Sequence, residues 1–214
     1  MFEQTIAFFQ QSPIAFIVFV VIFSLMIGSF LNVVVYRLPI MMHNGWYLEC
    51  REFLSEELAG STAKEIEPLT LSVPNSTCPK CRHKIRFYEN IPVISWMLLK
   101  GKCSSCKSNI AIRYPLVEAI TALLSAVIAY KFGVSLETLL LLVLTWGLVC
   151  LTLIDFDHML LPDQIVMPLL WLGFLINING LFIPLSDAVM GAAVGYMSLF
   201  SVFWLFKLLT GKEG

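Results

Sequence analysis

Long uninterrupted apolar runs are the feature of this sequence that most restricts its fold. Of the 214 residues, 58% are hydrophobic and only 14% are charged, whereas about 25% of the residues in a soluble domain are charged. A helix of about 20 apolar residues crosses a bilayer, and only helices and closed barrels satisfy their backbone groups there. The runs are continuous rather than alternating, which excludes a transmembrane β-barrel. The sequence therefore predicts an all-α polytopic membrane protein.

Five apolar segments are long enough to be spans. The chain before the first of them contains no Lys or Arg, and the run itself is too long for a cleavable secretory signal, so we expect a retained first span. The short connection 131–135 predicts that the second and third spans pack as an antiparallel hairpin. The five predicted transmembrane helices cover residues 13–36, 115–132, 136–154, 165–183 and 188–209.

A polar insert, residues 37–113, separates the first two spans. It holds 11 of the 14 Lys and Arg residues, and positively charged loops stay in the cytoplasm. We therefore expect a cytoplasmic insert, a cytoplasmic loop at 155–164 and a periplasmic N-terminus. The predicted regions are then 1–36, the insert, and a membrane domain over 114–214. The net charge of -1 gives no reason to expect a nucleic-acid partner.

The insert contains two Cys-x-x-Cys pairs, Cys78 with Cys81 and Cys103 with Cys106, and 21 residues separate the pairs. Two thiolates spaced in this way hold one metal from a tight turn, and the second pair completes the four sulfur ligands of a closed structural zinc site. In a cytoplasmic loop such pairs favour a metal over disulfides. Redox chemistry, free thiols and an iron–sulfur cluster remain alternatives. We expect structural zinc.

Three other residues of reactive types are expected to have ordinary roles. Cys50 is interpreted as an unliganded loop thiol, and Cys150 as a packing residue inside the third span. His158 is interpreted as a loop side chain rather than a metal ligand.

Asp155 directly follows the third apolar run. An ionisable residue at the end of a span is a candidate functional residue. Two such acids that share a proton can deprotonate a water and protonate a leaving amine, which is the aspartic protease scheme. The alternative is that acids at a helix end are simply solvated. Asp157 and Asp163 are weaker candidates because they lie farther into the loop, and Asp163 is expected to cap the next helix.

Several short blocks occur along the chain in a fixed order. They are GSFLNVVVYRLP at 28–39, the two cysteine pairs, YENIPVISW at 88–96, RYPLVE at 113–118, ID at 154–155, LPD at 161–163 and WLFKLLTGKEG at 204–214. Together they resemble the bacterial type IV prepilin peptidases, which are intramembrane aspartic peptidases. The similarity extends from about residue 12 to residue 214.

The resemblance implies two activities in the bacterial inner membrane. One removes the leader of type IV prepilins and type II secretion pseudopilins on the cytoplasmic side, and the other methylates the new N-terminal amine with S-adenosylmethionine. The resemblance also implies zinc at the four cysteines and places the first catalytic aspartate on Asp155. The cofactor-binding residues are undefined, but blocks 28–39 and 89–101 are expected near them. We further expect a basic leader to be attracted to Asp155, Asp157 and Asp163.

One feature of the family is missing from the sequence. The family carries its second catalytic aspartate in a Gly-x-Gly-Asp motif and has about eight spans, but these 214 residues contain no such motif. A single carboxylate cannot both accept and donate the shared proton. We therefore expect a C-terminally truncated peptidase, with a proteolytically inactive zinc scaffold as the alternative. A transporter is a further alternative, but no inverted repeat supports it.

Overall fold

The computed structural model describes residues 2–54 and 69–211, and its regular elements are helices, as predicted. The chain divides into two compact units, Met1–Pro162 and Asp163–Gly214. The first unit contains α1 (Phe2–Gln11), α2 (Pro13–Phe53), η1 (Phe87–Asn90), α3 (Ile94–Leu98), α4 (Arg113–Phe132) and α5 (Leu136–His158), and the second contains α6 (Asp163–Asn177) and α7 (Leu185–Thr210).

Four helices in the described part of the chain are long and apolar enough to cross a membrane, namely α2, α4, α5 and α7. The predicted span 165–183 is instead α6, whose 15 residues extend only about 22 Å against a bilayer core of about 30 Å. The helix ends where the Asn177 side chain accepts the N–H groups of Phe182 and Ile183 and donates to the carbonyl of Gly173. The prediction of five spans is therefore not confirmed.

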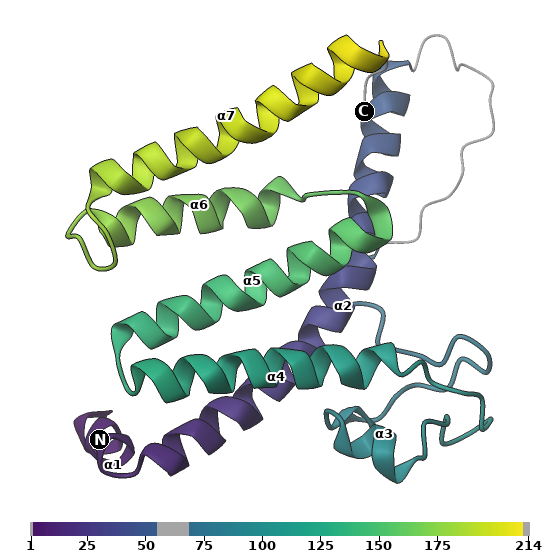
Figure 1. Ribbon diagram of the computed structural model, residues 1–214. Coiled ribbons are helices and arrows are strands. Elements are labelled where there is room, and N and C mark those ends of the chain that lie inside the picture. Colours follow the sequence, from purple (N-terminus) through teal and green to yellow (C-terminus); the bar gives the residue numbers. More distant parts are fainter. Residues whose placement is uncertain (1, 55–68, 212–214) are drawn as a thin grey trace. The chain divides into compact units, whose positions relative to one another are not determined.

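Helix α2 is much longer than the predicted first span, with 41 residues in place of 24. Pro13 occupies its first turn, where a missing N–H costs nothing. The helix continues past Pro39, and Figure 1 shows that it bends along its length, as expected for a proline inside a helix. At about 60 Å it is twice as long as the bilayer core is thick. The insert predicted to start at residue 37 therefore begins inside a helix.

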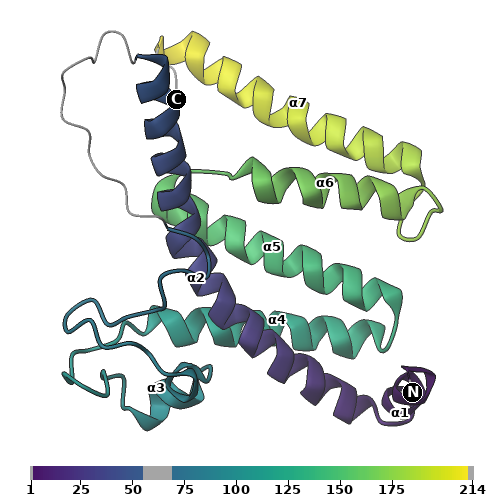
Figure 2. The ribbon, with the colours of Figure 1, turned by 180° about the vertical axis from the view of Figure 1, so that it is seen from behind.

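The core of the first unit is the crossing of α2 over α4, which Figure 2 shows with α2 in front. Small residues face each other at this crossing. A Cβ added at Gly28 would lie 2.8 Å from the Cα of Glu118 and 3.3 Å from the Cβ of Thr121. Ser24, Thr121 and Ser125 are completely buried. Small residues allow the two backbones to approach closely, which is how helices associate in membranes.

Helices α4 and α5 form the antiparallel hairpin that the sequence predicts (Figure 1). Gly133 ends α4 with a φ of 60°, and Ser135 caps α5 by accepting the N–H of Thr138 at 3.1 Å. The indole N–H of Trp146 donates to the hydroxyl of Ser125 at 3.0 Å, which links the two helices. A hydrogen bond between membrane helices contributes about 0.6 kcal/mol on average.

The second unit is a helical hairpin made of α6 and α7, which run side by side in opposite directions (Figure 1). No residue of α7 is buried in the described chain, so its apolar side chains are available to lipid. Gly211 ends α7 in the left-handed conformation, with a φ of 68°.

Candidate metal centre and interface carboxylates

The two cysteine pairs form two turns with the same hydrogen bonds. In the first turn the N–H of Cys78 donates to the carbonyl of His83 at 2.9 Å. In the second the N–H of Cys103 donates to the carbonyl of Ser108 at 2.8 Å. In both turns a backbone hydrogen bond therefore fixes the position of the first cysteine.

A residue in the left-handed backbone conformation follows the second cysteine of each pair. Arg82 has a φ of 56° and Lys107 a φ of 58°. This conformation costs roughly 1 kcal/mol or more for a residue with a Cβ, and it persists where surrounding structure requires it. The N–H groups of these residues donate to the carbonyls of Cys78 and Cys103. The repeated conformation shows that the two turns are equivalent.

The four cysteine sulfurs lie together, all within 4.8 Å of one another. The Cys78 and Cys106 sulfurs are 3.8 Å apart, and the Cys81 and Cys103 sulfurs are 4.0 Å apart. A tetrahedral ion with Zn–S bonds of about 2.3 Å requires sulfur separations of about 3.8 Å. The observed spacing fits such an ion, so the predicted group of four can hold a metal.

Hydrogen-bond donors around two of the sulfurs favour thiolates. The N–H groups of Cys81 and Lys80 and the hydroxyl of Ser108 lower the pKa of Cys78 to about 6. The hydroxyl and N–H of Ser108 lower the pKa of Cys106 as well. A thiolate is the form that ligates a metal.

Crowding of the sulfurs has the opposite effect on Cys81, whose pKa it raises. The N–H of His83 lowers the pKa of Cys81, but burial and hydrogen bonds from the other three thiols raise it overall, to about 11. Four negative charges cannot share so small a volume unless a cation compensates them. The electrostatics of the cluster therefore also fit a bound cation.

Glu89 connects the two turns from outside the sulfur cluster. Its carboxylate accepts the N–H of Arg86 at 2.9 Å, lies 3.3 Å from the ring Nε2 of His83 and hydrogen bonds to the hydroxyl of Ser104. The Arg86 N–H and the Ser104 hydroxyl lower the pKa of Glu89. Groups of this kind orient the ligands of a metal site. The sequence does not predict this role for Glu89, because the spacing of residues 83, 89 and 104 does not show that they lie together.

Asp155 lies in the last turn of α5, which continues to His158 rather than ending at Ile154 as predicted. The N–H of Met159, in the left-handed conformation, donates to the carbonyl of Asp155 at 2.8 Å and ends the helix. Ile154 is completely buried, whereas Asp155 is exposed. No hydrogen bond to the Asp155 carboxylate is found in the described part of the chain. Its carboxylate is available to pair with a second acid.

Asp157 is held by an ion pair that the sequence does not predict. Both nitrogens of the Arg113 guanidinium fork donate to its carboxylate, one of them at 2.9 Å. The pair joins the first residue of α4 to the last turn of α5. Since the partners lie 44 positions apart in the sequence, only the antiparallel packing of the two helices brings them together.

Two of the predicted cysteine and histidine roles need correction. Cys50 is exposed as expected, but it lies in α2 rather than in a loop, because that helix extends to Phe53. His158 is the last residue of α5 rather than a loop residue. Cys150 is buried in α5 and its packing role is confirmed.

The two blocks expected near the methyl donor meet at Glu118. Its carboxylate accepts the N–H of Val93 at 2.8 Å and hydrogen bonds to the side chain of Ser29. Ser29 belongs to block 28–39 and Val93 to block 89–101. Glu118 is 7% exposed and therefore lies inside this junction.

Two family models cover most of the chain. The bacterial peptidase A24 N-terminal domain matches residues 22–132, and the type IV leader peptidase family matches residues 142–214. The chain belongs to the type IV leader peptidase family. The first model includes α4 and the cysteine turns, and the second includes most of α5 with Asp155.

Three curated relatives of this chain share the name prepilin leader peptidase/N-methyltransferase. The protein from Stutzerimonas stutzeri is 52% identical over 98% of this chain and 71% of its own length. The protein from Pseudomonas putida is 53% identical over 97% of this chain and 70% of its own length. The protein from Neisseria gonorrhoeae is 48% identical over 90% of this chain and 66% of its own length. No solved structure matches the chain.

Proposed function

We propose that this protein removes the leader of type IV prepilins and of type II secretion pseudopilins and then methylates the new N-terminal amine. The observation that carries the proposal is identity of about half over nearly the whole chain to proteins named for both activities. The membrane helices support it, because a prepilin is itself a membrane helix and its peptidase must share the bilayer. The Cys₄ cluster and the exposed carboxylate at the end of α5 are consistent with it.

We propose Asp155 as a catalytic residue of the peptidase. In a two-carboxylate mechanism one acid accepts a proton from the attacking water and the other protonates the leaving amine. Asp155 is suited to this role because it is exposed at a helix end and forms no ion pair within the described residues. The second carboxylate is expected from a Gly-x-Gly-Asp motif, which the 214 residues do not contain.

The ion pair at Arg113 changes the predicted attraction of a basic leader. Asp157 already has a cationic partner, so it contributes less to the attraction than Asp155. We therefore assign the attraction of the leader mainly to Asp155 and Asp163.

We propose zinc as the metal of the Cys₄ cluster, with a structural role. All four ligands come from the protein, so no position is open for substrate. The ion would be held by Cys78, Cys81, Cys103 and Cys106, and it would stabilise an insert with few buried apolar residues. For the methyl transfer, S-adenosylmethionine is the donor that the family implies, and the junction around Glu118 is the proposed region.

We propose that the insert lies in the cytoplasm of the bacterium and that the N-terminus is periplasmic. The excess of Lys and Arg in the insert supports this orientation. The end of α5 is then on the cytoplasmic side as well, where the leader of a prepilin lies. The substrate, the carboxylate and the insert would thus share one side of the membrane.

A cleavage assay with a prepilin in mixed micelles tests the proposal. We expect Asp155→Asn to reduce cleavage to roughly one thousandth or less, which is typical for loss of a catalytic carboxylate. Membrane insertion and zinc content should be unchanged. The assay compares the 214-residue chain with the product of any longer reading frame in the encoding DNA. Cleavage retained by the Asn variant of an active protein would assign the role to another residue.

A further inference from the structure

Helix α3 exposes an apolar face that nothing in the described chain covers. Ile94, Met97 and Leu98 are 53%, 65% and 77% exposed, and their spacing places them on one side of the helix. On the other side Trp96 contacts Gly101 and donates its indole N–H to the carbonyl of Ile110 at 3.2 Å. The helix is therefore held from one side and presents apolar side chains on the other.

A hydrogen bond to a membrane helix sets the position of α3. The N–H of Val93, directly before α3, donates to Glu118 of α4. Glu118 is five residues beyond Arg113, the first residue of α4, which corresponds to about 7.5 Å along the helix axis. If α4 spans the bilayer, α3 begins beside the end of a span, at the depth of the lipid headgroups.

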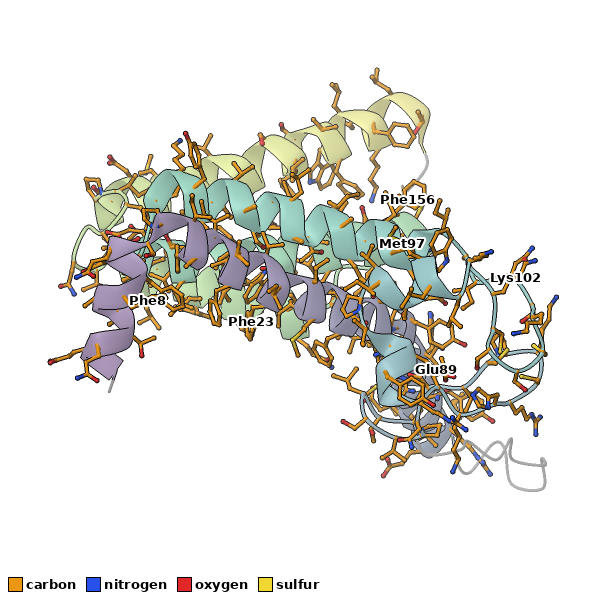
Figure 3. All side chains as sticks on the ribbon, turned by 90° about the horizontal axis from the view of Figure 1, so that it is seen from below. Phe8, Phe23, Glu89, Met97, Lys102 and Phe156 are labelled. Carbon is orange, nitrogen blue, oxygen red and sulfur yellow. The ribbon has the colours of Figure 1, made fainter. Side chains whose placement is uncertain are left out.

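The residues around α3 carry a strong positive charge. Residues 77–107 contain seven Lys or Arg residues and one acid, Glu89. Four thiolates with a bound zinc ion would add a net charge of about −2, so the segment would still be positive overall. That acid is already engaged by His83 and by the N–H of Arg86. Lys100 and Lys102 are exposed just after α3, and Figure 3 labels Met97 on this helix and Lys102 in the loop that follows. The basic residues are Lys80, Arg82, Lys84, Arg86, Lys100, Lys102 and Lys107.

We propose that α3 lies in the headgroup region of the cytoplasmic leaflet and docks the insert on the membrane surface. Ile94, Met97 and Leu98 face the acyl chains, while Lys100 and Lys102 contact anionic phospholipid headgroups. Exposed apolar residues beside basic ones are the pattern of an interfacial helix, and basic residues near the membrane are attracted to an anionic surface. This inference rests on the cytoplasmic placement of the insert, but not on proteolytic activity.

Fluorescence quenching in vesicles tests the docking. A genetically encoded fluorescent amino acid replaces Met97 in the full chain, which is reconstituted into phosphatidylcholine vesicles with or without phosphatidylglycerol. We expect headgroup-level nitroxide lipids to quench the probe by roughly half and aqueous iodide to quench it far less, because an interfacial helix buries its apolar face about 5–10 Å deep. The same probe at Leu98 provides a second reading, and zinc content verifies that each labelled insert is folded.

A matched charge variant tests the lipid partner. Lys100→Gln with Lys102→Gln should reduce nitroxide quenching only in vesicles that contain phosphatidylglycerol. Strong iodide quenching and weak lipid quenching at both positions would overturn the proposal. Should added prepilin then protect the probe, the face would belong to the protein substrate instead. Leader cleavage is not the readout, so this result is separate from the outcome of the cleavage assay.

Discussion

Asp155 and Asp157 are neighbours in the last turn of α5, yet their surroundings differ. Asp157 is paired with Arg113, and the Asp155 carboxylate has no partner in the described chain. A bidentate Arg partner fixes the position of the Asp157 carboxylate and occupies both of its oxygens. The unpaired Asp155 carboxylate is therefore the better candidate for a group that contacts a water molecule and the substrate. The packing of α4 on α5 thus separates two acids that the sequence alone does not distinguish.

Loss of the Arg113–Asp157 ion pair should have a small effect on the stability of the protein. The Arg113 and Asp157 side chains are 45% and 22% exposed, and exposed pairs contribute about 0.2–1 kcal/mol. We expect Arg113→Gln to lower the free energy of unfolding by less than about 1 kcal/mol. Equilibrium unfolding in mixed micelles measures it, with Lys131→Gln at the other end of α4 as the control. A much larger cost would mean that the pair organises the helix ends.

The metal should be lost when each turn loses one cysteine ligand. Cys78→Ser combined with Cys103→Ser removes one ligand from each turn, so we expect the bound zinc, about one ion per wild-type chain, to be lost. Elemental analysis of the purified protein measures the metal. Cys50→Ser is the matched control, because that thiol lies in α2 and outside the cluster. Wild-type protein without any metal would refute the Cys₄ assignment.

At the scale of elements, the close crossing of α2 and α4 depends on small residues. Ser24 and Gly28 on α2 are four residues apart, as are Thr121 and Ser125 on α4, so each pair lies on one face of its helix. Ser24, Thr121 and Ser125 are completely buried. The crossing also places Glu118 next to Ser29. The junction that joins the insert to the membrane helices therefore depends on this packing.

A single methyl group should disturb the crossing. The Cβ of Gly28→Ala would lie 2.8 Å from the backbone of Glu118, so the helices must separate, at a cost of about 1–3 kcal/mol. Gly45→Ala in the same helix is the control, since nothing lies within 4 Å of its Cβ. That control should be neutral or should stabilise by about 0.5–1 kcal/mol. Equal thermal stability of the two variants in detergent would contradict the packing analysis.

At the scale of the whole molecule, the metal cluster and the membrane helices depend on different forces. The cysteine turns bury little apolar surface, and Cys78 and Cys103 are the buried hydrophobic residues between residues 69 and 112. The helices α2, α4 and α5 pack through their own contacts. The insert should therefore depend on its metal far more than the spans do. α6 and α7 form a separate compact unit without any cysteine.

Removal of the metal by a chelator should unfold the insert and leave the membrane helices folded. A zinc chelator is expected to open residues 77–110 to hydrogen exchange, because binding of a structural metal is part of the folding free energy of its domain. The helices α4 and α5 should remain protected and the far-ultraviolet circular dichroism nearly unchanged. Hydrogen exchange with mass spectrometry measures both parts in one sample. Loss of helix protection on chelation would show that the spans also need the metal.

Most of the local features follow from the sequence by itself. The apolar runs predict the helices α2, α4, α5 and α7, because a helix in lipid satisfies its own backbone groups within one segment. The spacing of the four cysteines predicts the metal ligands, since each pair needs only a tight turn. The position of Asp155 at the end of a span is likewise local information. The lengths of α2 and α6 differ from the predicted lengths.

Helix packing determines which residues distant in the sequence contact each other. The Arg113–Asp157 pair, the Val93–Glu118 hydrogen bond and the contact of Gly28 with α4 join residues that lie 25 or more positions apart. No periodicity or motif encodes such contacts, because they depend on which helix faces pack and at what register. The early end of α6 also depends on side-chain hydrogen bonds of Asn177 with a following turn. The sequence determined the helices, the cysteine ligands and the candidate carboxylate. Helix packing determined which side chains contact each other.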